Sequence, residues 1–268
     1  MSEQPYVYDE TIAARYEKAV PIQDGELEFY LELARAAEAQ GLPTLEVACG
    51  NGRVAVPLAR EGIRVTGIDT SQPMLAIARE KSAGLDNVRW LDGDMRDFNL
   101  GEQFGLVYIA IGTFQLMLTV EDQLACLRCV RNHLAPEGRF AFEVENPNLV
   151  AMAEWLTSKK GQFFRNPRRD HDDPDTGLRV SSWGSADYHP SEQRYETNGF
   201  TEELDPGGTV VRRQYGKPMI LRYFHRYEVE HLLARAGFAV EALYGDLRKS
   251  PLRGTSPDLI FVAKRDDA

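Results

Sequence analysis

A short apolar run that ends in two glycines constrains the fold of this chain more than any other stretch. Leu45 to Ala48 has the composition of a buried strand, Gly50 and Gly52 interrupt it, and residues 53–59 have the composition of a helix. A strand, a glycine turn and a helix start expose backbone N–H groups and the positive end of a helix dipole. The pattern therefore predicts an α/β fold with an anion or nucleoside site at the turn.

The turn alone leaves two interpretations open. Residues 50–55 fit the dinucleotide fingerprint of nicotinamide-dependent oxidoreductases, including its permitted final alanine. The same residues also fit a glycine turn with no ligand, because a single fingerprint of this kind is a weak signal. Motifs on the next strands of the chain are needed to choose between them.

Carboxylates mark three successive predicted strands. Residues 64–69 form a second strand that ends at Asp69, and residues 88–91 form a third strand, after which Asp94 lies. With Glu46 in the first strand, three acidic residues lie at or near strand ends, where open α/β sheets bind their ligands. A dinucleotide site requires only the middle acid, which holds the ribose hydroxyls.

These motifs resemble those of the class I S-adenosylmethionine-dependent methyltransferases. The resemblance covers residues 40–145 well and residues 225–265 more loosely, and the motifs occur in the family's order at fitting intervals. The sequence departs from the family at Ala48, where many relatives have glycine. The matching motifs are Glu46-x-Ala48-Cys49-Gly50-x-Gly52, Gly67-Ile68-Asp69 and Gly93-Asp94-Met95.

The resemblance implies S-adenosyl-L-methionine as cofactor and S-adenosyl-L-homocysteine as product. It assigns the ribose diol to Asp69, the adenine amino group to Asp94 and the adenine ring to the backbone N–H of Met95. The turn from Ala48 to Gly52 runs beside the methionine moiety in this interpretation. Tyr16 belongs either to an arm that closes over the cofactor or to a helix packed on the surface. The predicted cofactor-binding residues are Tyr16, Glu46, Ala48, Gly50, Gly52, Arg53, Asp69, Thr70, Met74, Asp94, Met95, Ile109 and Ala110.

Polar residues come after the fourth predicted strand, residues 106–111. The main-chain carbonyls of Ile109 and Ala110 are candidates to accept hydrogen bonds from the cofactor ammonium. Thr113 and Gln115 come directly afterwards and are candidates to orient the substrate. The alternative is that these residues form an ordinary loop.

The order of predicted elements indicates a doubly wound α/β fold. The resemblance implies a mostly parallel seven-stranded sheet, Rossmann-like, whose last strand is antiparallel to the others. We expect residues 1–146 and 225–268 to form the cofactor-binding domain and residues 147–224 to form an inserted antiparallel β and lid region.

The inserted region contains stretches whose sequence pattern repeats every two residues, which is typical of β-strands. Its period-two stretches are Leu178–Tyr188, Arg194–Leu204 and Thr209–Leu221, and residues 205–208 form a hairpin turn. The chain loosely resembles amino-sugar N-methyltransferases, in which a comparable insert covers the substrate and supports dimers. That likeness implies a homodimer as an option. The substrate-contact candidates here are Tyr195, Arg222 and Tyr223.

The composition of the chain limits the kinds of molecule that it is expected to bind. The chain has 31 basic and 41 acidic residues, which gives a net charge of −10. An acidic chain is a poor binder of nucleic acid, whose affinity comes from basic surface. No apolar run has the length of a membrane span, and the start of the chain lacks a secretion signal. We therefore expect a cytoplasmic enzyme that acts on a small molecule rather than on nucleic acid or a membrane.

Cysteines and histidines do not indicate a metal site. Cys126 and Cys129 form a C-x-x-C pair, but no second pair supplies the ligands that zinc needs, so packed helix cysteines explain them better. Five scattered histidines form no cluster either. His225, where the insert returns to the core, is the best candidate for a general base, although a capping or packing role fits as well.

Methyl transfer from a sulfonium is an in-line displacement with a neutral leaving group. It requires no metal, and it requires a base only when the nucleophile arrives protonated. The sequence thus predicts a methyltransferase that acts on a nitrogen or oxygen of a small molecule. The alternatives are an NAD(P)-dependent oxidoreductase and a non-catalytic protein that binds S-adenosylmethionine.

Overall fold

A computed structural model describes residues 8–166, 170–174 and 176–267. The chain divides into two compact units. Unit 1 contains Met1–Asn146 and Phe224–Ala268, and unit 2 contains Pro147–Tyr223. The second boundary therefore falls one residue before the position expected from the sequence.

Unit 1 is built around a seven-stranded sheet in the order β12-β13-β5-β4-β1-β2-β3. The first five strands along the chain are parallel, and β13 is antiparallel to both of its neighbours. This arrangement confirms the predicted fold class. The strands are β1 (Thr44–Val47), β2 (Val65–Asp69), β3 (Val88–Asp92), β4 (Phe104–Ile109), β5 (Leu134–Glu145), β12 (Phe238–Tyr244) and β13 (Asp258–Arg265).

The strand order reverses between β1 and β4. From β1 the chain proceeds outward to β2 and β3, and it then returns to the other side of β1 through β4 and β5. Loops that leave neighbouring strands in opposite directions separate at such a point, and ligands of open α/β sheets bind there. The glycine turn after β1 lies at this position.

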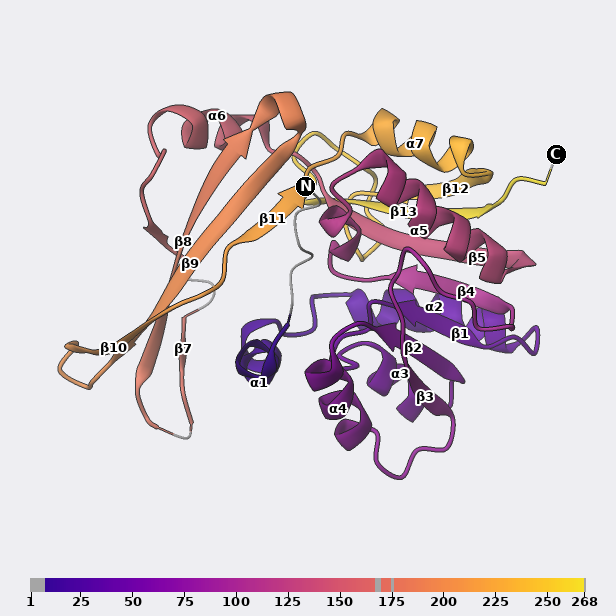
Figure 1. Ribbon diagram of the computed structural model, residues 1–268, viewed down its shortest axis with the longest axis horizontal. Coiled ribbons are helices and arrows are strands. Elements are labelled where there is room, and N and C mark those ends of the chain that lie inside the picture. The colour runs from indigo at the N-terminus through magenta and orange to yellow at the C-terminus, as the bar shows by residue number, and fades with distance from the viewer. Residues whose placement is uncertain (1–7, 167–169, 175, 268) are drawn as a thin grey trace. The chain divides into compact units, whose positions relative to one another are not determined.

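Helices cover both faces of the sheet (Figure 1). Side chains of α2 and α3 line one buried cluster, and side chains of α5 and α7 line the other. Local caps explain where some helices begin: Ser71 accepts the N–H of Met74 at the start of α4, and Thr119 accepts the N–H of Asp122 at the start of α5. The helices of unit 1 are α1 (Glu10–Ala19), α2 (Glu26–Glu38), α3 (Ala55–Arg60), α4 (Gln72–Lys81), α5 (Val120–His133) and α7 (Arg226–Arg235).

The fifth strand starts earlier than the sequence indicates. The Pro-Glu-Gly stretch at residues 136–138 predicts a turn before the strand, but β5 begins directly after α5. Its pairing with β4 shifts from Phe104↔Leu134 to Leu106↔Arg139, so residues 135–138 form an irregular bulge within the strand. The Pro-Glu-Gly sequence therefore bends the strand rather than initiating it.

Unit 2 is an antiparallel six-stranded sheet with one α-helix among its described residues. Strands β8 and β9 pair from Arg179↔Leu204 to His189↔Arg194 and form its centre. The elements are α6 (Leu149–Thr157), β6 (Phe164–Arg165), β7 (His171–Asp172), β8 (Arg179–His189), η3 (Pro190–Glu192), β9 (Arg194–Leu204), β10 (Val210–Tyr215) and β11 (Met219–Arg222).

The third period-two stretch of the insert is two strands rather than one. β10 and β11 both pair with β9, and residues 216–218 interrupt them. Pro218 lacks an N–H group and cannot continue a ladder, which explains the break. The hairpin turn at residues 205–208 is confirmed, because Asp205 and Thr209 are hydrogen-bonded across it and Gly208 has φ +82°.

Candidate functional site

Asp69 joins the first two sequence motifs through hydrogen bonds. Its Oδ2 accepts the N–H of Gly50 at 2.8 Å, and its Oδ1 accepts the N–H of Ser71 at 2.8 Å. Burial raises the pKa of Asp69, and the two backbone hydrogen bonds oppose that shift. The carboxylate at the end of β2 is therefore fixed against the glycine turn after β1.

The glycines of the motifs serve two different purposes. A Cβ at Gly52 would lie 2.7 Å from the Trp90 ring, and a Cβ at Gly67 would lie 2.5 Å from the same ring. These two glycines make room for a tryptophan on β3. A Cβ at Gly50 meets only the Met74 methyl carbon, at 3.9 Å, within the described part of the chain. Gly50 is thus the glycine that leaves space beside the turn.

Ala48 adopts a left-handed conformation with φ +58°. This conformation costs an L-residue roughly 1–2 kcal/mol and costs glycine almost nothing. We expect Ala48→Gly to raise the free energy of unfolding by about 0.5–1 kcal/mol, because part of the relief is lost to the greater flexibility of the unfolded chain. Urea titration would measure the change. The control is Ala59→Gly in α3, which should lower stability, and a loss at both positions would refute the strain.

Glu46 connects two elements of the fold. Its side chain is buried inside β1, and Oε2 accepts the N–H of Ala55 at 3.0 Å. Burial raises the pKa of Glu46 to about 8, against the opposing influence of Tyr108 and Arg53. Glu46 therefore connects β1 to the start of α3 by a hydrogen bond. The other two motif acids, Asp69 and Asp94, are more exposed to solvent than Glu46.

Arg53 forms a buried ion pair that no sequence pattern indicated. Both terminal nitrogens contact Glu26 of α2, at 2.6 Å and 2.5 Å, and one also donates to the Pro21 carbonyl at 3.2 Å. Tyr16 of α1 lies in the same surroundings. Burial raises its pKa, and the charges of Arg53 and Asp69 are among those that act on it. The turn is thus surrounded by α1 and α2.

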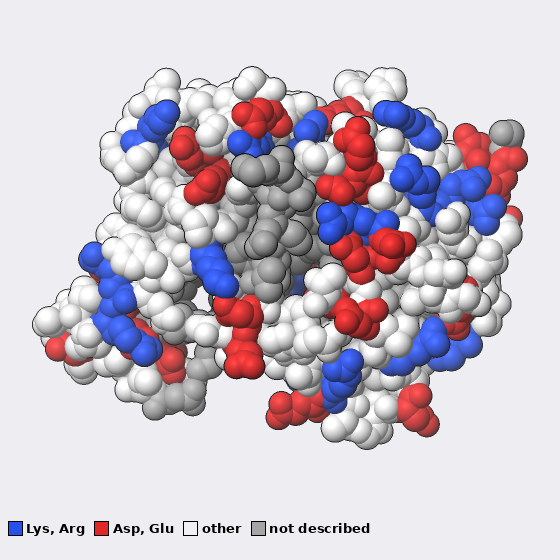
Figure 2. Space-filling view, in the orientation of Figure 1, with Lys and Arg blue, Asp and Glu red and all other residues white. Residues whose placement is uncertain are grey.

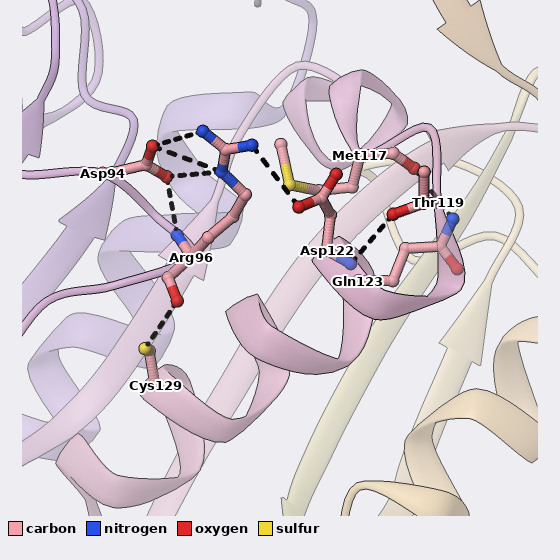
Figure 3. Close-up of polar contacts among 7 residues, drawn as sticks. All are labelled: Asp94, Arg96, Met117, Thr119, Asp122, Gln123 and Cys129. Atoms are coloured by element: carbon pink, nitrogen blue, oxygen red, sulfur yellow. Dashed lines mark hydrogen bonds and ion pairs between the residues drawn. The ribbon is translucent and has the colours of Figure 1, made fainter. Parts of the chain in front are cut away.

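Asp94 is held by Arg96 (Figure 3). The Arg96 Nη2 lies 2.6 Å from the Asp94 Oδ2, and the Arg96 backbone N–H donates to Oδ1 at 2.9 Å. These bonds lower the pKa of Asp94. On its other side the guanidinium contacts Asp122 of α5 at 3.4 Å. The motif acid is therefore ionised and oriented by a residue two positions further along the chain, which lies outside the sequence motif.

The loop after β4 is held by its own side chains. In the segment η1 (Thr113–Leu116), the Thr113 hydroxyl donates to the Ala110 carbonyl at 2.8 Å. Gln115 is buried, and its Oε1 accepts the N–H of Glu145 at 3.0 Å. Ile109 is buried in β4. Thr113 and Gln115 thus stabilise the loop, and their roles toward a substrate stay predictions.

Comparison with known proteins identifies the family. Residues 44–138 match the family model described as a methyltransferase domain. The structure of the methyltransferase CcbJ from Streptomyces caelestis is 26% identical, covers 98% of this chain and 99% of that chain, and has a TM-score of 0.77. Residues 44–138 therefore belong to the methyltransferase domain family, and over its whole length the chain is similar to a solved methyltransferase.

Curated relatives agree with this methyltransferase assignment. The dTDP-3-amino-3,4,6-trideoxy-alpha-D-glucopyranose N,N-dimethyltransferase of Streptomyces venezuelae is 28% identical over 218 residues, which are 80% of this chain and 82% of that protein. The cypemycin N-terminal methyltransferase of a Streptomyces species is 29% identical over 143 residues, 53% of this chain and 58% of the relative. The chain spans about half of the length of the first curated relatives that it matches.

The chain has a strained residue beyond β4. Ile111 is β-branched and has φ +54°, a conformation that is rare for such residues. Glu143 of β5 holds it by accepting the Ile111 N–H, and the Tyr30 hydroxyl donates to the other Glu143 oxygen at 3.0 Å. Burial raises the pKa of Glu143 to about 8. A buried acid thus fixes the backbone at the ligand edge of the sheet.

This acid should make stability depend on pH. The folded chain keeps the Glu143 proton up to about pH 8, whereas the ordinary value is 4.5. The native state binds more protons in that window, so its stability falls as the pH rises. In Glu143→Gln this fall should be shallower by up to about 1.4 kcal/mol per pH unit. Urea titrations from pH 5 to 8 would measure it, with Glu145→Gln, an exposed acid, as control. Equal slopes in all three proteins would contradict the assignment.

The substrate-contact candidates of unit 2 come together. Tyr195 and Tyr223 are buried with Met152, and the rings of Tyr188 and Tyr195 stack at 5.1 Å. The ring of Tyr223 lies 6.2 Å from that of Tyr188. The Arg222 guanidinium donates to the Gln193 side chain at 3.3 Å. Tyr195 and Tyr223 thus belong to an aromatic cluster at the end of the β8–β9 hairpin, and their contact with a substrate stays a prediction.

His225 is the exposed N-cap residue of α7. Its backbone N–H points to Glu228 of the same helix, at 3.5 Å. Capping explains its position, and a role as general base stays a prediction. Thr70, a cofactor candidate, is exposed next to Asp69.

Cys126 and Cys129 are reduced, and Cys126 is fully buried in α5. Burial raises the pKa of both thiols, which keeps them protonated and unreactive. No cluster of metal-ligating side chains occurs within residues 8–166, 170–174 and 176–267. No described helix is long and apolar enough to cross a membrane. Figure 2 shows basic and acidic side chains interspersed on the face displayed.

Proposed function

We propose that this methyltransferase binds S-adenosylmethionine along the carboxyl edge of β1, β2 and β3. The ribose diol lies on Asp69, the adenine amino group on Asp94 with the Met95 N–H at the ring, and the methionine moiety beside residues 48–52. The bond between Asp69 and the Gly50 N–H supports this most directly, because it places a ribose acceptor against the motif glycine that leaves space.

The residues fit the cofactor. A carboxylate has about four acceptor sites, so Asp69 retains capacity for hydroxyls beside the Gly50 and Ser71 amides. Asp94 is paired with Arg96, whose guanidinium also contacts Asp122. When an adenine amino group binds to Asp94, the guanidinium can turn toward Asp122. An acceptor carboxylate selects an amino group over a carbonyl at that place on the purine.

The cofactor supplies an activated methyl group on a positively charged sulfur. The protein's task is to hold the acceptor in line with it and to exclude water. Tyr16 of α1, beside the turn, is suited to cover the methionine end. An amine acceptor that arrives neutral requires no strong base, so transfer to such an acceptor does not depend on a base at His225.

We infer a nitrogen acceptor on a small molecule. One relative that aligns over 80% of this chain is an N,N-dimethyltransferase of an amino-deoxysugar nucleotide. In unit 2 the partly exposed ring of Tyr188, which stacks on the buried ring of Tyr195, offers an aromatic surface for a ring of the acceptor. A homodimer and a cytoplasmic location remain predictions from the sequence.

The test is methyl transfer from radiolabelled S-adenosylmethionine to a panel of paired acceptors. Each pair has one scaffold that carries an amine or a hydroxyl at the same carbon, and amino-deoxysugar nucleotides head the panel. Transfer to amines with release of S-adenosylhomocysteine is expected. Transfer to hydroxyls alone would overturn the nitrogen assignment, and failure to bind the cofactor would overturn the function.

A further inference from the structure

Arg96 occupies the carboxylate of Asp94. Among the described residues, the backbone N–H and the Nε of Arg96 both donate to Oδ1 of Asp94 at 2.9 Å. Nη2 donates to Oδ2 at 2.6 Å, and Nε also reaches Oδ2 at 3.2 Å. A carboxylate has about four acceptor sites. Asp94 therefore has little capacity left for a further donor while the guanidinium stays in this position.

Asp122 offers the same guanidinium a second position (Figure 3). Its Oδ1 lies 3.4 Å from Nη1 of Arg96, and the guanidinium lies between the two carboxylates. Asp122 belongs to the first turn of α5, where the helix dipole favours a negative charge. The side chains of Asp94 and Asp122 are each 35% exposed and that of Arg96 is 33% exposed, so the guanidinium can move between them without opening the core.

The two positions of the guanidinium suit different purines. With Arg96 on Asp94, the site presents guanidinium N–H groups, which match the carbonyl oxygen of a 6-oxopurine. With Arg96 on Asp122, the site presents a free Asp94 carboxylate, which accepts from the amino group of a 6-aminopurine and repels a carbonyl oxygen. The residue that draws the guanidinium away from Asp94 therefore sets which purine is preferred.

We propose that Asp122 determines the preference for a 6-aminopurine, because it holds the Arg96 guanidinium when the amino group binds to Asp94. The inference rests on the proposed function and adds to it the residue that sets the purine specificity of the same site. Asp122 does not touch the ligand. It is a positioning residue that acts through Arg96.

Two ligands that differ at one position of the purine test this. S-adenosylhomocysteine has the amino group, and S-inosylhomocysteine has a carbonyl oxygen on the same carbon. Calorimetry should show that the parent protein binds the first about tenfold more tightly or better, since a hydrogen bond to a charged group is at stake.

Asp122→Asn should lower this preference by about fivefold, the contribution of a partly exposed ion pair. The fall should come from weaker binding of S-adenosylhomocysteine and not from tighter binding of S-inosylhomocysteine alone. The thermal midpoint should change little, because asparagine keeps the shape of the side chain and the Thr119 cap uses the backbone N–H of residue 122.

Arg96→Met supplies the decisive comparison. Without the guanidinium, Asp94 is open whether or not residue 122 is charged, so adding Asp122→Asn should change the preference by less than about twofold. Arg96→Ala repeats the comparison if the methionine variant fails to fold. The matched control is Glu121→Gln, an exposed acid in the same turn of α5, which should leave the preference within about twofold of the parent.

Two results would overturn the inference while S-adenosylhomocysteine binding keeps the proposed function intact. The first is an unchanged preference in Asp122→Asn, or an equal fall with and without Arg96. The second is a parent protein that binds both ligands equally. A parent protein that binds neither ligand would overturn the inference and the proposed function together.

Discussion

Arg53→Met is expected to lower the free energy of unfolding by about 3–5 kcal/mol, because it leaves the buried carboxylate of Glu26 without its cation. The arginine is 8% exposed and the glutamate is fully buried, so water does not screen the pair. Glu26 also accepts the Gln23 N–H at 2.8 Å, but that hydrogen bond does not neutralise a charge. Urea unfolding at pH 7 would measure the loss.

The matched test is the double variant Glu26→Leu with Arg53→Met. Removal of both charges should recover most of the lost stability, since a buried ion pair replaced by apolar residues is often neutral. The exposed pair of Arg35 and Glu61 is the control, and Arg35→Met should cost less than about 1 kcal/mol. Additive losses in the double variant would show that the packing of each side chain matters more than the ion pair.

Asp69→Ala should weaken the binding of S-adenosylmethionine by roughly 10- to 100-fold. A hydrogen bond to a charged group contributes about 1.5–3 kcal/mol, and the variant also loses the acceptor that holds the Gly50 N–H. His225→Ala should change this affinity much less, because His225 is an exposed residue at the start of α7. Calorimetry with the cofactor would compare the two variants.

Asp92→Ala is the matched control for that loss. Asp92 is the same residue type, is exposed, and is the β3 partner of Asp69 in the parallel pairing. Its replacement should leave affinity within about twofold of the parent, since screened surface charges contribute little. Unchanged affinity in Asp69→Ala would remove the ribose assignment. An equal loss of affinity in Asp92→Ala would show that the loss in Asp69→Ala is a general effect of charge.

The parallel sheet and the ligand edge could be predicted from the sequence because those features are encoded locally. Alternating glycines after an apolar run, and acids after the next two strands, define the strand ends without knowledge of long-range contacts. The cap at Ser71 is encoded just as locally, since the residues that make it are neighbours. Family resemblance then assigned the roles of the motif residues.

Long-range partners could not be predicted in this way. Glu26 and Arg53 are 27 residues apart, and no local pattern marks Glu26 as buried. Gly52 and Gly67 matched the ligand motif, but the ring of Trp90, opposite Gly67 on β3, is what excludes a side chain there.

Calorimetry of the parent protein with S-adenosylmethionine and with NAD tests the central assignment most directly. A site formed by Asp69, Asp94 and the turn at Gly50 should bind the sulfonium cofactor and should show no heat with NAD. Tight binding of NAD together with no binding of S-adenosylmethionine would contradict the assignment.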